Sequence, residues 1–148
     1  MSASHPPMAH RTAGPLARPF LQETQRNLAL WTLQAWLAMF FLAAGYTKLT
    51  QPRNLLDVLL GWTDQTPPVL VTGLGVLETA LGLGVVASLI TWRLRRLVTG
   101  SALVLSGLAL VMLCLHLWRF EPGLALVNLS LAAFAVLVFI GRTREARR

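Results

Sequence analysis

The sequence predicts an all-α fold, namely an integral membrane four-helix bundle with both termini in the cytoplasm. The first observation is composition: 55% of the 148 residues are hydrophobic and only 13% are charged, whereas a soluble domain carries about 25% charged residues. The second is that the apolar residues gather in four long runs. The third is that arginines gather near both termini and between the second and third runs.

Each of the four runs is long enough to cross a bilayer as a helix, because about 20 residues at ~1.5 Å per residue span a hydrocarbon core of ~30 Å. The runs are Leu28–Tyr46, Pro68–Ile90, Leu97–Trp118 and Gly123–Gly141. They predict a disordered cytoplasmic tail over residues 1–27, a four-helix transmembrane domain over 28–142 and a basic cytoplasmic tail over 143–148. Helices joined by the short connections are expected to pack antiparallel.

The distribution of basic residues predicts the orientation. Ten arginines lie before the first run, between the second and third runs, and after the fourth. The other two connections hold three basic residues beside three acidic ones. The positive-inside rule therefore places both termini in the cytoplasm. These arginines lie beside membrane spans and form no soluble basic face with interleaved aromatics, so the bilayer is the expected partner and nucleic acid is not.

The longest outer connection, residues 47–67, is predicted to contain a short amphipathic helix on the membrane surface. Its apolar residues, such as Leu56 and Leu59, alternate with polar Asn54 and Asp57. Prolines then end this helix and open the second span, where proline is tolerated in the first turn. Interfacial anchoring is the expected role of four tryptophans near the predicted boundaries: Trp31, Trp62, Trp92 and Trp118.

Glu78 is the one ionisable residue in the apolar core of the second run. An acidic residue near the centre of a membrane helix costs about 2.5–3.5 kcal/mol on insertion scales. Glu78 must therefore face the bundle and find partners, or be protonated. Gly75, Glu78 and Gly82 share one helical face, and small residues let membrane helices approach closely. Intramembrane acids usually mark ligand sites or proton paths.

Each predicted span brings a polar group to the outer half of the bundle. Glu78 and His116 are the candidate catalytic residues, which would handle protons. Lys48, Arg119 and Asn128 are the candidate ligand-binding residues. The alternative for all five is structural: a buried network that fixes the register of the helices, with Lys48 and Arg119 extending to water and headgroups and Asn128 bonding between helices.

Several chemistries find no support in the sequence. A thiol–disulfide oxidoreductase needs two cysteines, and Cys114 is the only one. A bis-histidine haem site needs two membrane histidines, and His116 stands alone in the four runs. No P-loop, dinucleotide fingerprint or metal-ligand pattern is present. No cofactor is therefore evident, and the chain carries no visible redox centre of its own.

Four segments resemble the DoxX family of small four-helix membrane proteins, which includes DoxD-like subunits. The resemblance covers residues 28–142 and rests on "FLAAGYTKL" (Phe41–Leu49), "GLGVLETALGLGVV" (Gly73–Val86), "LHLWR" (Leu115–Arg119) and "VNLSLAAFAVLVFIGR" (Val127–Arg142). It implies a multi-pass protein of the bacterial inner (plasma) membrane. DoxD-like members are associated with thiosulfate:quinone oxidoreduction, and DoxX-like members with membrane complexes handling thiol or oxidative stress. The family pattern marks Lys48, Glu78, His116 and Asn128 as quinone-proximal or proton-handling groups.

The leading hypothesis is an inner-membrane subunit of an oxidoreductase system that interacts with quinone through the outer polar cluster and with a redox protein partner. Whether the chain itself is an enzyme stays open at this point. The first alternative is a non-enzymatic membrane scaffold or assembly partner. The second is a small-solute or proton pathway, which four helices without inverted repeats make less favourable.

Overall fold

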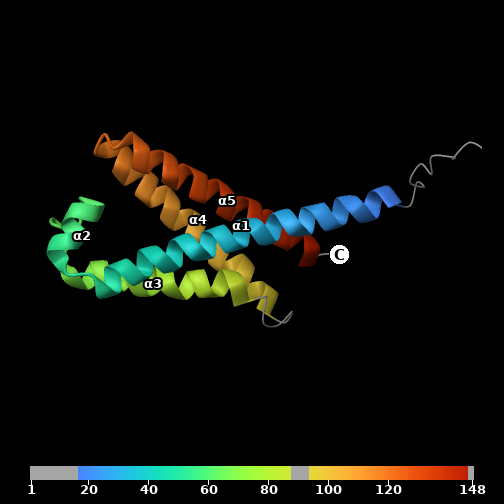
Figure 1. Ribbon diagram of the computed structural model, residues 1–148, viewed down its shortest axis with the longest axis horizontal. Coiled ribbons are helices and arrows are strands. Elements are labelled where there is room, and N and C mark those ends of the chain that lie inside the picture. The colour runs from blue at the N-terminus through green and yellow to red at the C-terminus, as the bar shows by residue number, and fades with distance from the viewer. Residues whose placement is uncertain (1–16, 88–93, 147–148) are drawn as a thin grey trace, which may run out of the picture.

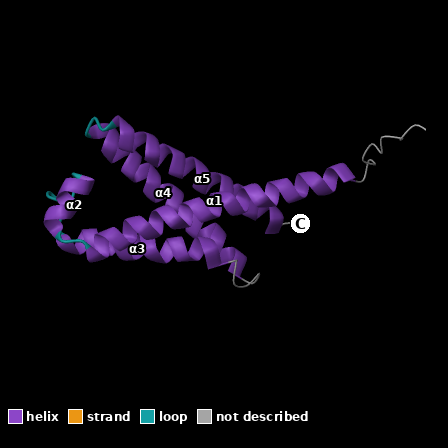
Figure 2. Ribbon diagram, viewed as in Figure 1, coloured by secondary structure: helices purple, strands orange, loops and turns teal. Residues whose placement is uncertain are grey.

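The structure is a computed structural model, and residues 17–87 and 94–146 are described. They form five helices in the order α1 (Ala17–Thr50), α2 (Arg53–Leu60), α3 (Pro68–Val86), α4 (Arg95–Trp118) and α5 (Pro122–Ala146). These described segments contain helices and connecting turns and no strand (Figure 2). The all-α prediction is therefore confirmed.

Four of the helices are long and apolar enough to cross a membrane. These spans are Leu21–Thr50, Pro68–Val86, Arg96–Trp118 and Pro122–Glu145. The four predicted membrane helices are confirmed, and the cytoplasmic placement of the termini stays a prediction. The fifth helix, α2, is the short amphipathic helix expected in the longest connection: Leu56 is buried, while Val58 is exposed.

The helical segments extend further than the apolar runs. The α1 helix begins at Ala17, so the prediction of disorder was wrong for residues 17–27. An apolar pattern is not required there, because α1 extends beyond the bundle (Figure 1) and Arg26 pairs with Glu23 within the helix at 3.5 Å. Likewise α5 continues through residues 143–146. Residues 1–16, 88–93 and 147–148 lie outside the described residues. They include the predicted end of the second span and Trp92 in the connection that follows it.

The helices pack as two antiparallel pairs, with α1 against α3 and α4 against α5, and smaller contacts of α3 with α4 and α1 with α5 close the bundle. Glycines allow the α1–α3 pair to cross closely. A Cβ atom at Gly45 would lie 2.7 Å from the Gly75 carbonyl oxygen and against Thr79 Oγ1. The small face predicted on the second span is therefore the face that α1 covers.

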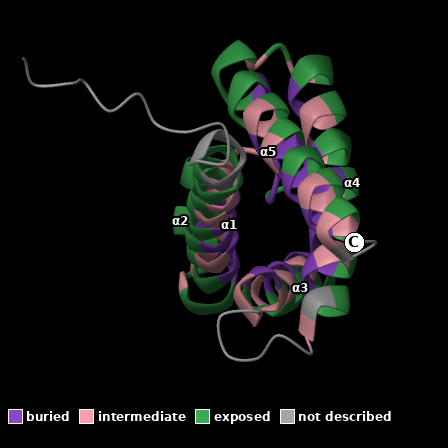
Figure 3. Cartoon of the chain, turned by 90° about the vertical axis from the view of Figure 1, so that its right-hand side faces the viewer, coloured by how far each residue is buried: buried purple, intermediate pink, exposed green. Residues whose placement is uncertain are grey.

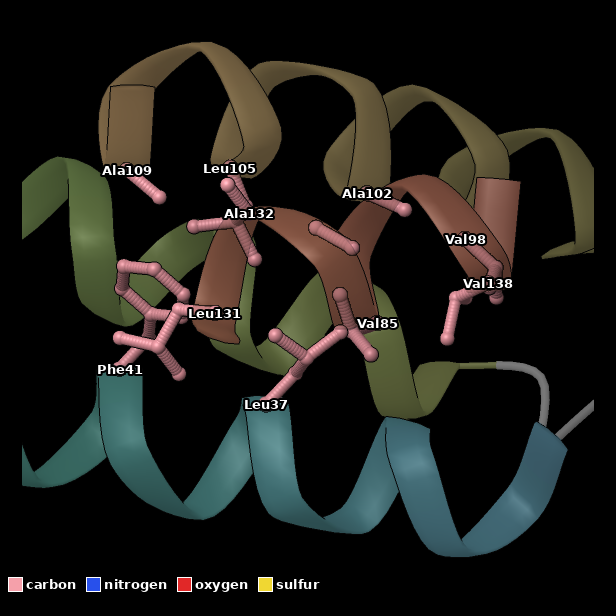
Figure 4. Close-up of a cluster of buried hydrophobic side chains, with 11 residues drawn as sticks. Leu37, Phe41, Val85, Val98, Ala102, Leu105, Ala109, Leu131, Ala132 and Val138 are labelled. Atoms are coloured by element: carbon pink, nitrogen blue, oxygen red, sulfur yellow. The ribbon is translucent and has the colours of Figure 1, made fainter. Parts of the chain in front are cut away.

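The largest apolar cluster lies between all four long helices. Figure 4 shows side chains of Leu37 and Phe41 from α1 directed toward Val85 of α3 and toward residues of α4 and α5 such as Leu105 and Leu131. Seen along the bundle, the buried residues face inward and the exposed residues face outward (Figure 3). This core holds the two helix pairs together.

The two helix pairs diverge toward the end of the bundle where α2 lies, called the α2 end below (Figure 1). A second apolar cluster of Leu56, Trp62 and Val71 closes this end. The α2 helix ends at Leu60, and its capping residue Gly61 has a left-handed φ of 70°, a conformation that favours glycine. Trp62 follows at once and is buried, so its predicted role as an interfacial anchor was wrong. The turn at Gly61 directs this side chain into the bundle.

Candidate functional site

Lys48 and Glu78 form an ion pair that is buried between α1 and α3. Lys48 Nζ donates hydrogen bonds to Glu78 Oε1 at 3.0 Å and Oε2 at 2.7 Å. Both side chains are only 5% exposed. A buried charge is tolerated when an opposite charge and hydrogen bonds compensate for its lost hydration. The structure therefore gives Glu78 the partner that its position in an apolar helix requires.

The local fold explains why this lysine reaches this acid. Glu78 lies on the buried face of α3, which also contains Val71, Gly75, Gly82 and Val85. At Gly75, a Cβ atom would lie 2.9 Å from Lys48 Cβ. The absence of a side chain at Gly75 thus leaves room for the Lys48 stem, whose ammonium group bonds Glu78 further along the same face.

The ion pair forms part of the wall of a cavity of about 110 Å³ at the α2 end. All four long helices and the α2 segment contribute to this wall. Its polar residues are Lys48, Glu78, His116 and Asn128. Its apolar residues are Phe40, Phe41, Ala44, Leu59, Leu60, Trp62, Leu108, Ala109, Met112, Leu124 and Val127. Four of the five residues proposed from the sequence therefore meet at one largely apolar cavity.

A second and more polar cavity of about 200 Å³ lies on the other side of Lys48. Its polar wall is formed by Lys48, Gln51, Arg53, Thr63 and Thr72. Lys48 is the residue common to both walls. The ion pair thus stands between an apolar space inside the bundle and a polar space beside the start of α2 and α3.

Arg119 does not contribute to the apolar cavity. Its Nη2 atom donates to the Gly61 carbonyl oxygen at 2.8 Å, and its Nε atom donates to Glu121 Oε1 at 2.9 Å. These bonds connect the α4–α5 turn to the end of α2. The structure therefore places Arg119 where it holds the α2 segment over the cavity, away from the position expected for a ligand-binding residue.

Glu121 bonds His116 and was not among the residues proposed from the sequence. His116 Nδ1 and Glu121 Oε2 are 2.7 Å apart. Phe120 between them has a left-handed φ of 56°, and this sharp turn lets the Glu121 amide donate to the His116 carbonyl at 2.9 Å. Hydrogen bonds from His116 and then Arg119 lower the pKa of Glu121 below its ordinary value of 4.5. The Glu121 carboxylate is therefore ionised at neutral pH.

The ionised Glu121 determines the tautomer of a neutral His116. A carboxylate only accepts hydrogen bonds, so His116 Nδ1 carries the proton in this contact. The other ring nitrogen, Nε2, then carries no proton and has the lone pair of a hydrogen-bond acceptor. His116 and Glu121 are five residues apart, on either side of the end of the third span. Helical periodicity alone does not predict a contact at this spacing, so it was not predicted from the sequence.

The Asn128 side chain forms a hydrogen bond within its own helix, α5. Its side-chain amide donates to the Leu124 carbonyl oxygen at 2.9 Å. The bond between helices that the structural alternative predicted for Asn128 is absent from the contacts that the structure describes. The half-buried Asn128 side chain retains a carbonyl oxygen at the cavity wall.

A separate polar network joins three helices at the opposite end of the bundle. Gln34 donates to the Val85 carbonyl oxygen at 2.8 Å and accepts from Arg142 Nε at 2.9 Å. Arg142 also bonds Glu145 at 2.8 Å and lies 4.6 Å from the centre of the Trp31 ring. Gln34 thereby satisfies a carbonyl in the last turn of α3, a group that helix geometry leaves unpaired.

The family comparison covers the candidate site. A family model described as the DoxX-like family matches residues 32–138, a range that includes Lys48, Glu78, His116 and Asn128. No curated protein and no solved structure matched the chain. Among the residues that the structure describes, no group of three or more His, Cys, Asp or Glu side chains is placed to hold a metal ion. With its family model matched over most of its length, the chain belongs to the DoxX-like family.

Proposed function

We propose that this membrane protein is a subunit of an oxidoreductase system and that it binds the ring of a quinone in the apolar cavity. The observation that carries the proposal is the Lys48–Glu78 ion pair on the wall of that cavity. A buried ion pair is weak evidence for stability, because well-packed apolar residues are often as good. Because stability alone does not explain the buried Lys48–Glu78 pair, we propose that the pair takes part in binding a ligand.

The cavity suits a single planar ring in size and polarity. Its volume of about 110 Å³ is of the same order as the ~150 Å³ apolar cavity that accepts benzene. The buried apolar side chains of the wall, such as Phe41 and Ala109, would contact the ring faces. The ammonium group of Lys48 carries three N–H donors, and a carbonyl oxygen of a quinone is an acceptor for one that Glu78 does not use.

The polar residues of the wall have complementary roles in this proposal. Lys48 would stabilise negative charge that develops on the ring oxygen during reduction. Glu78 and His116 would exchange protons with the reduced ring. Electrons would come from a separate redox protein, because the sequence shows no redox centre in this chain.

The positive-inside rule indicates on which side of the membrane the cavity would lie. It places the termini in the cytoplasm, so the cavity at the α2 end would lie in the outer half of the bacterial inner membrane. Glu121, whose side chain is partly exposed near His116, would then face the outer aqueous phase.

Fluorescence quenching tests quinone binding, because Trp62 is part of the cavity wall. A tail-less benzoquinone titrated into the purified protein should quench fluorescence in a saturable manner. The saturable part should disappear in Trp62→Phe and persist in Trp36→Phe, since Trp36 is lipid-exposed and outside the cavity. Lys48→Met, measured by calorimetry, should weaken binding by about 10-fold, because it removes the charged donor to the ring oxygen.

A strictly linear quenching curve that is the same in Trp62→Phe would contradict quinone binding. The proposal of a membrane scaffold would then replace that of quinone binding, because no ligand would bind at the polar residues of the cavity. That alternative predicts that partner proteins still co-purify with Glu78→Gln as long as the variant is folded.

A further inference from the structure

We infer that the apolar cavity opens sideways into the bilayer between α1 and α5, and that the ligand has a long apolar tail that passes through this opening. The inference rests on the proposed function and deepens it, because it assigns the class of ligand and its route. The ligand would be a single-ring head group with an isoprenoid or alkyl chain that stays in the lipid.

The exposure of the cavity wall identifies the opening. The wall residues from α3 and α4 are buried or half-buried. The exposed wall residues are Phe40 at 39%, Leu59 at 55%, Leu124 at 42% and Val127 at 39%. They come from α1, α2 and α5 and from no other helix. The exposed rim of the cavity is thus on the side where α1 and α5 face each other.

The arrangement of the helices produces this opening. At the end that holds the chain termini, α1 and α5 are in contact, because Leu30 packs directly on Gly141. From there the two helices diverge toward the α2 end (Figure 1). The cavity lies where they have separated. The main core cluster, which includes Leu37 and Ala135, closes the space on the side of the termini.

The α2 segment closes the remaining side. Leu60 and Trp62 form the part of the wall that lies toward the outer surface, and the exposed Leu59 lies at its edge. The bond from Arg119 to the Gly61 carbonyl oxygen holds this segment in place. A head group that enters the cavity therefore has its free exit between α1 and α5.

The chemistry of the rim selects an apolar tail. All four exposed rim residues carry hydrocarbon or aromatic side chains. Three of them lie on α1 and α5, which are long enough to cross the bilayer. A hydrocarbon chain that crosses this rim passes from lipid to apolar side chains and loses no hydration. An ion or a polar chain would lose its hydration without a compensating partner.

The test compares bulky substitutions on and off the rim of α5. Leu124→Trp and Val127→Trp narrow the opening, and Leu126→Trp and Leu129→Trp are matched controls on the exposed surface of the same helix outside the cavity wall. Each variant in lipid nanodiscs is titrated calorimetrically with a tail-less benzoquinone and with the same quinone carrying a decyl chain.

The rim variants should bind the decyl quinone about 10-fold or more weakly than the wild type, because the tail clashes with the added side chain. They should bind the tail-less quinone within about twofold of the wild type, which also shows that they are folded. The two control variants should bind both quinones as the wild type does.

Three results would overturn the inference, and they separate it from the proposed function. Rim variants that keep full affinity for the decyl quinone would show that the tail leaves elsewhere. An equal loss of both quinones would show that the rim contacts the ring and not a tail. If the wild type binds neither quinone, the proposed function fails, and the assignment of a tailed quinone fails with it.

Discussion

Breaking the Lys48–Glu78 ion pair from one side should destabilise the protein more than removing both charges. The single variants are Glu78→Leu and Lys48→Met, and the third variant combines them. Each single variant leaves one charged group in a site where the native side chain is only 5% exposed. The double variant replaces both charges with apolar side chains of comparable length.

The magnitudes follow from the geometry of the pair. At 2.7 Å, the two charges attract each other by about 6 kcal/mol at an effective dielectric constant of ~20. Burial costs each ion several kcal/mol of hydration, so the net contribution of the pair is small. Loss of one partner removes the attraction and leaves the desolvation cost of the other. We expect each single variant to lose about 3–5 kcal/mol, and the double variant to match or exceed the wild type.

The free energy of unfolding is measured by denaturant titration of the four proteins in the same mild detergent. Val76→Leu, on the exposed face of α3, serves as the control and should stay within about 0.5 kcal/mol of the wild type. A single variant as stable as the wild type would refute the reasoning, because the remaining charge would then be hydrated or neutral. A double variant as unstable as the singles would refute the view that the pair adds little net stability.

Three further outcomes follow from the structure. Gly45→Ala should lose about 1–3 kcal/mol of unfolding free energy in the same detergent assay, since its Cβ would lie 2.7 Å from a backbone oxygen of α3; Gly73→Ala, with no heavy atom within 4 Å, should lose none. Because the pKa of Glu121 is lowered in the folded state, its stabilising contribution is complete above pH 4.5 and disappears as the pH falls through that lowered pKa. Acidification should therefore reduce the free energy of unfolding less in Glu121→Gln than in the wild type. An equal reduction in both proteins would contradict this reasoning. Gln34→Leu should lower the free energy of unfolding by about 1–3 kcal/mol, because it removes the acceptor of the buried Arg142 guanidinium and the donor to an α3 carbonyl. Gln25→Leu, at an exposed position of the same helix, is its control. Equal stability of the two variants would contradict the role of the network.

Features that depend on the period or length of a local segment were predicted correctly from the sequence. Four apolar runs became four membrane-length helices because length and composition alone set that property. The face of α3 with Gly75, Glu78 and Gly82 was predicted because positions three and four residues apart share a helix face. The amphipathic α2 was predicted in the same way.

The convergence of Lys48, Glu78, His116 and Asn128 was predicted, but several other contacts between distant segments were not. Gln34 and Arg142 are 108 residues apart in the sequence, and no local pattern joins them. Arg119 was placed at the site because it ends the third span, but the turn at Phe120 directs it to Gly61 and Glu121. The start of α1 was missed because a helix that extends beyond the bundle has no apolar face to mark it. The chemical roles of the residues around the cavity stay predictions.

The packing of α1 on α3 and the chemistry of the cavity depend on the same glycines. Gly45 and Gly75 allow the close crossing, and Gly75 also leaves the space that the Lys48 stem occupies. A side chain at Gly75 would move Lys48 and would thereby change its distance from Glu78. The same crossing keeps α1 beside α3 while the other helix pair diverges, and this divergence creates the cavity. A substitution that separates α1 from α3 should therefore reduce ligand binding together with stability, whereas one that acts only on Glu121 should leave the α1–α3 crossing intact.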